Sequence, residues 1–68
     1  MNQDVFNMSL RKFLKRVGVT SQRELENAIQ NAVSSGVLSG TEAVKVKMTL
    51  TIDGLGTTHT VEDDIALE

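Results

Sequence analysis

The sequence predicts a small α+β domain in which two N-terminal helices pack on one face of a C-terminal antiparallel β-hairpin, in the order α-α-β-β. Apolar residues recur at helical spacing up to Val33, whereas apolar and polar residues alternate strictly from Ala43 to Asp53. A glycine-rich turn at Gly54-Leu55-Gly56 then leads into a second alternating segment. With 68 residues and no linker-like stretch, the chain is expected to form one domain, residues 1–68.

The first helix is expected over about residues 4–17. Five apolar residues form one stripe of a 3.6-residue repeat there: Phe6, Leu10, Phe13, Leu14 and Val17. Asn2 or Asp4 is expected to cap its start, because short polar side chains accept hydrogen bonds from the free amides of a first turn. Gly18 is expected to end it in the left-handed conformation.

The second helix is expected over about residues 22–35. Ser21 and Glu24 have the spacing of a capping box, in which each side chain accepts from the other residue's amide. Gly36 is placed to end this helix. Its buried side is predicted to consist of Leu25, Ala28, Ile29, Ala32 and Val33.

The strands are expected at about residues 43–53 and 58–67. The apolar residues of the first strand have even numbers and those of the second have odd numbers, so both sets share a face only if paired numbers add to an odd sum. A sum of 111, with a loop around Gly54 to Thr57, satisfies this condition. On the polar face it predicts the pairs Lys47–Asp64 and Thr51–Thr60, and on the apolar face Ile52–His59 and Leu50–Val61.

Asp63 interrupts the apolar face of the second strand. Two explanations fit: the strand bulges there, or an inward carboxylate at a sheet edge opposes association with other edges. The bulge is the favoured interpretation.

Composition excludes several classes of function. The chain has no cysteine and one histidine, so neither a disulfide framework nor a His-rich zinc site is expected. Two phenylalanines are its only aromatic residues, which argues against the stacking of bases. His59 is expected to have a structural role, and Glu62, Asp63 and Asp64 to form a solvated patch, because consecutive strand residues point to alternate faces. We therefore expect no enzyme, no cofactor and no metal.

No segment of the sequence predicts a secretory signal or a membrane span. The N-terminus lacks a basic region followed by an apolar run, and apolar stretches are short throughout. The expected location is the cytoplasm.

Charge is distributed unevenly along the chain. Five basic residues against Asp4 give residues 1–23 a charge of +4, although the whole chain carries −2. These basic residues are candidate contacts for nucleic acid or an acidic partner: Arg11, Lys12, Lys15, Arg16 and Arg23. A solvated polar face is the favoured interpretation, and a helix-turn-helix-like nucleic-acid-binding domain is the alternative. Glu24 and Glu26 count against that alternative, because they place acid beside the presumed base-reading residues.

The exposed edge of the hairpin is the other candidate site. Edge strands add strands from other chains through main-chain hydrogen bonds. The predicted partner contacts on this strand are Lys45, Lys47, Thr49 and Thr51. The leading hypothesis is a non-enzymatic module that binds a protein partner or a second copy of itself. Both a monomer and a homodimer with a four-stranded sheet stay open.

Two stretches of the sequence resemble a known family. They are Phe6 to Glu24, with Asn7-Met8-Ser9 followed by Arg11-Lys12-Phe13-Leu14-Lys15 and Gly18-Val19-Thr20-Ser21-Gln22-Arg23-Glu24, and Met48-Thr49-Leu50-Thr51-Ile52-Asp53-Gly54. Together they resemble a small family of uncharacterised bacterial proteins, mostly proteobacterial, over nearly the whole chain. The resemblance implies a stand-alone cytosolic domain and brings no activity with it.

Overall fold

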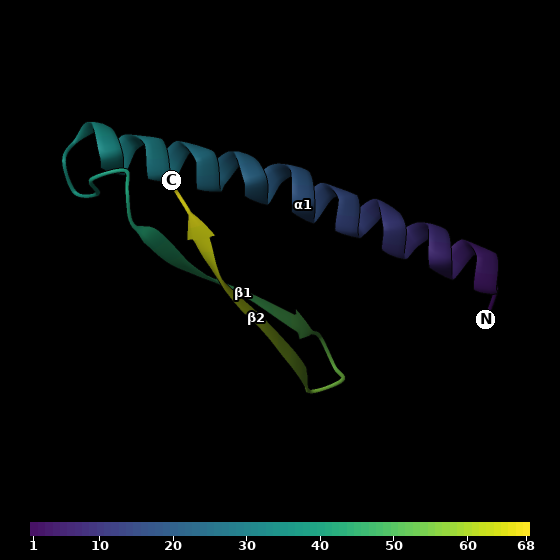
Figure 1. Ribbon diagram of the computed structural model, residues 1–68. Coiled ribbons are helices and arrows are strands. Elements are labelled where there is room, and N and C mark those ends of the chain that lie inside the picture. Colours follow the sequence, from purple (N-terminus) through teal and green to yellow (C-terminus); the bar gives the residue numbers. More distant parts are fainter. The chain divides into compact units, whose positions relative to one another are not determined.

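The computed structural model describes all 68 residues and consists of two compact units, Met1–Val37 and Leu38–Glu68. The first unit holds one helix, α1 (Gln3–Ser34). The second holds two strands, β1 (Ala43–Ile52) and β2 (Thr57–Ala66), paired as an antiparallel hairpin (Figure 1). The predicted α+β class is confirmed.

Both ends of α1 lie where the sequence predicts helix boundaries. The Asn2 side chain accepts a hydrogen bond from the Val5 amide at 3.1 Å, which satisfies one of the free donors of the first turn. At the other end Gly36 has a φ of +83°, and its amide donates to the Val33 carbonyl at 3.1 Å. Glycine adopts this left-handed conformation without steric cost, so the helix ends there.

The predicted break between two helices is wrong, because α1 continues through residues 18–21. Gly18 keeps a helical backbone, and the Thr20 hydroxyl donates to the Arg16 carbonyl at 2.7 Å. Ser21 lies inside the helix, so it does not begin a capping box with Glu24.

Two physical reasons explain the continuity of α1. The chain contains no proline, and an interior glycine costs a helix only about 1 kcal/mol. In addition, Val17, Ser21 and Leu25 follow one another at intervals of four, so the first predicted apolar stripe continues into Leu25, Ala28 and Ala32 of the second. Ile29 and Val33 of the second stripe lie farther round the helix, toward Arg11 and Lys15.

The hairpin has a register two residues away from the predicted one. Paired residue numbers add to 109, as in Val44–Ile65 and Ile52–Thr57, and the loop is Asp53–Gly56. The odd sum was predicted correctly, so both apolar sets do share a face. The observed loop contains two glycines with positive φ, Gly54 at +77° and Gly56 at +64°.

Cross-strand pairs account for this register. On the polar face the sum of 109 aligns two Lys–acid pairs and two Thr–Thr pairs, whereas a sum of 111 aligns fewer. These pairs are Lys45–Asp64, Lys47–Glu62, Thr49–Thr60 and Thr51–Thr58.

The favoured bulge at Asp63 is also wrong. The ladder runs without interruption from Ala43–Ala66 to Ile52–Thr57, and Asp63 faces Val46 directly. The Asp63 carboxylate accepts from the Asp64 amide at 2.8 Å. Asp63 is thus an acidic residue on the apolar face of a regular strand.

The helical Gly18 gives a first prediction. A Cβ atom added there meets nothing within 4 Å, so Gly18→Ala should raise the free energy of unfolding by about 0.5–1 kcal/mol, since alanine loses less backbone entropy. Urea denaturation followed by circular dichroism at one protein concentration measures this. Gly36→Ala is the matched control and should destabilise, because its φ of +83° strains any L side chain. Destabilisation by Gly18→Ala would contradict a continuous helix.

Candidate functional site

The backbone of β1 presents a free edge. The Leu67 amide donates to the Glu42 carbonyl at 3.2 Å, so residues 42 and 67 form a hydrogen-bonded pair just beyond the strands. Hydrogen-bonded and non-hydrogen-bonded pairs alternate in an antiparallel ladder. The odd-numbered residues of β1 therefore direct their amide and carbonyl groups away from β2. They include all four predicted edge residues: Lys45, Lys47, Thr49 and Thr51.

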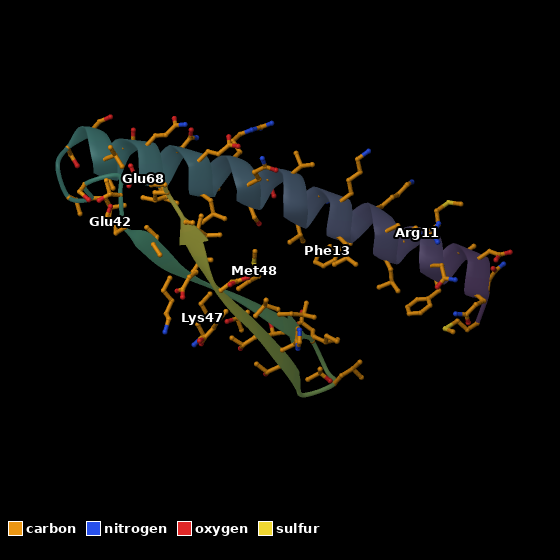
Figure 2. The ribbon with its side chains drawn as sticks, viewed as in Figure 1. Arg11, Phe13, Glu42, Lys47, Met48 and Glu68 are labelled. Atoms are coloured by element: carbon orange, nitrogen blue, oxygen red, sulfur yellow. The ribbon has the colours of Figure 1, made fainter.

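The two faces of the hairpin differ in polarity. Lys47 and Met48, both labelled in Figure 2, are neighbours in β1 and belong to opposite faces. The apolar face carries these residues from both strands: Val44, Val46, Met48, Leu50, Ile52, Val61 and Ile65. None of them is buried, and Val61 exposes 54% of its surface. His59 lies opposite Leu50 on this face and is exposed.

The five basic residues of α1 share one side of the helix. Because the helix is continuous, Arg23 lies seven residues after Arg16, almost two full turns, and so on the same side. At 100° per residue the five side chains fall within an arc of about 140°. We call this set the basic face: Arg11, Lys12, Lys15, Arg16 and Arg23. Glu26 is the acidic residue that shares it most closely.

A second set of residues follows the other side of α1. We call it the apolar seam: Phe6, Leu10, Phe13, Leu14, Val17, Ser21, Leu25, Ala28 and Ala32. Its N-terminal members are the more exposed, as Phe13 (51%) and Leu14 (61%) show. Val17, Ser21, Leu25 and Ala32 are half-buried. Figure 2 labels Phe13 on the seam and Arg11 on the basic face.

Glu42 stabilises the loop that precedes β1, a role that was not predicted from the sequence. One of its carboxylate oxygens accepts from the Ser39 amide at 3.1 Å, and the other accepts from the Gly40 amide at 2.8 Å and the Ser39 hydroxyl at 3.0 Å. The signal was present as Ser39-Gly40-Thr41-Glu42, a Ser-x-x-Glu pattern with no helix after it.

These contacts change the acidity of Glu42. Hydrogen bonds from the backbone amides of Ser39, of Glu42 itself and of Gly40 lower the pKa of this carboxyl group from 4.5 to about 2. The carboxylate is the form that accepts these bonds, so the folded state holds it ionised. Both carboxylate oxygens accept these bonds and so stabilise the loop.

Neither metal-binding nor membrane-spanning features emerge from the structure. It places no group of three or more His, Cys, Asp or Glu side chains where they could hold a metal ion. No helix combines the length and the apolar character that a bilayer crossing requires.

The lowered pKa of Glu42 predicts a pH dependence of stability. A folded-state pKa below the unfolded value stabilises the fold above about pH 4.5, and that contribution is lost as the pH falls toward about 2. Glu42→Gln should flatten the decline of the free energy of unfolding over this interval, measured by urea denaturation at several pH values. Equal declines in the variant and the unaltered chain would refute the role of Glu42.

Comparison with known proteins gives a family and no activity. No curated protein and no solved structure matches the chain. A family model does match, over residues 1–68, and it describes a family of unknown function. This agrees with the resemblance noted from the sequence. The chain therefore belongs to the family of unknown function DUF6494.

Proposed function

We propose that this protein is a non-enzymatic interaction module that binds a second copy of itself or another protein. One observation carries the proposal: no side chain is buried in either unit, while large apolar side chains are exposed in both. Phe6 and Leu10 of α1 are each 42% exposed, and Met48 of β1 is 44% exposed. Burying such side chains contributes about 1.5–3 kcal/mol each, so a protein surface that covers them would stabilise the chain substantially.

Each unit also has a physical reason to need such a surface. A two-stranded hairpin is at best marginally stable in water, because three or more strands or a packed helix are usually required. Most of the stability of a helix in a protein comes from packing of its apolar side and not from intrinsic propensity. Association supplies this packing to whichever face is left uncovered.

The free edge of β1 supports a particular mode of association. When β1 of a second copy lies antiparallel with Thr49 facing Thr49, the outward-directed amides and carbonyls of both strands meet. Lys45 then comes level with Asp53, of opposite charge, at the start of the second copy's loop. Met48 lies beside Leu50 of the second copy, so the apolar faces join into one. The result is a dimer with two-fold symmetry and one four-stranded sheet.

A proline at the centre of this edge tests the mode. Thr49→Pro removes an outward amide and leaves the ladder to β2 intact, so it should raise the dissociation constant of self-association at least tenfold without loss of structure. Light scattering across a hundredfold concentration range measures the mass against the 7.4 kDa of one chain. Thr49→Val keeps the amide and should associate normally. If Thr49→Pro associates as tightly as the unaltered chain, the edge is not the site.

Nucleic-acid binding is a second candidate function, and the continuity of α1 favours it. The break predicted from the sequence would have separated Arg23 from the other basic residues, whereas the single helix puts all five on one face. A row of Lys and Arg along a helix matches the phosphates of a nucleic-acid backbone. The net charge of −2 and the lack of Tyr and Trp weigh against it.

Charge reversal tests this candidate. Binding of a fluorescein-labelled nucleic acid, followed by anisotropy, should weaken with salt, with a log–log slope of about −4.5 for a DNA duplex and about −3.5 for an RNA strand if five phosphates are contacted. Reversing Arg11, Lys12, Lys15 and Arg16 to glutamate should abolish it. Reversing Lys45 and Lys47 is the control and should change it little. Binding that survives the reversal on α1 would eliminate the basic face as the site.

The cellular setting of this function is also a proposal. The expected bacterial cytoplasm rests on the family resemblance, and a module of this kind would meet its protein partners there.

A further inference from the structure

The two edges of the hairpin are not equivalent. Because residues 42 and 67 form a hydrogen-bonded pair, the even-numbered residues of β2 direct their amides and carbonyls outward, away from β1. One of these outward amides is already occupied: the Asp64 amide donates to a carboxylate oxygen of Asp63 at 2.8 Å. The other amides of this unit that donate to side chains all precede β1: Ser39, Gly40 and Thr41. The edge of β1 is therefore open, whereas the edge of β2 carries a carboxylate.

The polar face of the hairpin would favour the addition of one hairpin to another. Lys45 and Lys47 lie on β1, and their cross-strand neighbours Asp64 and Glu62 lie on β2. If β2 of a second copy adds to the outer edge of β1 with paired numbers again adding to 109, outward residues meet outward residues and the polar faces join. Every Lys–acid and Thr–Thr pair of the hairpin is then repeated between the two copies.

Such a head-to-tail addition has no end of its own. It joins β2 of one copy to β1 of the next, so each added hairpin offers a new β1 edge to another copy. Contacts of this kind produce open filaments, whereas two-fold contacts close. Soluble proteins with exposed strands therefore protect their edges, often with charged side chains that include inward-pointing ones.

The Asp63 carboxylate opposes this addition at a particular hydrogen bond. In the head-to-tail register the Asp64 amide has to donate to the Lys45 carbonyl of the second copy. Asp63 holds that amide, so the Lys45 carbonyl oxygen would meet another acceptor in place of a donor. Displacing the carboxylate is unfavourable too, because hydrogen bonds from amides to ionised groups are roughly twice as strong as those between neutral groups.

We propose that Asp63 closes the β2 edge and thereby directs strand addition to β1 alone. The inference rests on the proposed strand-edge association and specifies which edge of the hairpin takes a partner strand. In a two-fold dimer joined at β1, both outer edges are β2 strands that carry this carboxylate, so the sheet ends at four strands. The proposal also gives a role to an acidic residue that faces Val46 on the apolar face of a regular strand.

Removal of the carboxylate tests the proposal. Asp63→Ala frees the Asp64 amide, so the mass from light scattering at the highest concentration of a hundredfold range should exceed that of the unaltered chain about threefold or more. Adding Thr60→Pro removes another outward amide of β2 and should return the mass to that of the unaltered chain. Glu68→Gln is the charge-matched control. It neutralises an acid just beyond β2 and leaves the Asp63 carboxylate in place, so its mass should not rise.

The hydrogen bond itself is measured separately from association. At a concentration where Asp63→Ala and the unaltered chain have the same mass, amide hydrogen exchange is compared after correction for the intrinsic rate of each sequence. Exchange at Asp64 should be about threefold or more faster in Asp63→Ala, because its amide has lost its acceptor. Exchange at Val61, whose amide is directed toward β1, should not change.

The contrary results separate this inference from the proposed function. Closure of β2 by Asp63 is overturned if Asp63→Ala keeps the mass of the unaltered chain, if its growth persists with Thr60→Pro, if Glu68→Gln grows equally, or if exchange at Asp64 is unchanged. Unlimited growth of the unaltered chain overturns it as well. A mass of 7.4 kDa for the unaltered chain at every concentration instead overturns self-association through β1. Asp63→Ala must then still associate if the closure of β2 is to stand.

Discussion

The geometry of α1 depends on the phase of the apolar residues on either side of Gly18. Val17, Ser21 and Leu25 continue one helical row through the position where a turn was expected, so the backbone stays helical and the two halves of α1 share one face. The same continuity rotates Arg23 onto the side of Arg16. Both candidate surfaces of the helix thus follow from one condition, namely that the residues before and after the glycine have the same periodicity.

Local rules predicted the boundaries of the elements well. The Asn2 cap, the left-handed Gly36 and the alternation in β1 each depend on a few neighbouring residues, and the structure confirms all three. The predicted break at Gly18 was wrong because a glycine with a capping serine three residues later does not end a helix when the apolar spacing continues past both residues. Here the absence of proline and the shared apolar phase outweigh a cost of about 1 kcal/mol.

The hairpin shows a different limit of sequence reasoning. Side-chain alternation has a period of two, so it determines the parity of the register and cannot distinguish sums that differ by two. The distinction came from the loop, where two glycines with positive φ fit four residues, and from the additional Lys–acid and Thr–Thr pairs. The role of Glu42 was not predicted for a related reason. The Ser-x-x-Glu pattern normally begins a helix, and no helix follows Glu42.

Because backbone groups in β1 alternate in direction, amide hydrogen exchange in this strand shows whether another chain is bound at its edge. In a hairpin whose edge is free, the outward amides of Lys45, Lys47 and Thr49 exchange their hydrogens with solvent, while those of Val46 and Met48 are held by β2. Any chain that adds to this edge, whatever its identity, slows the first group and leaves the second unchanged. Hydrogen exchange along ten residues therefore separates an occupied edge from a free one without a labelled partner or a known ligand.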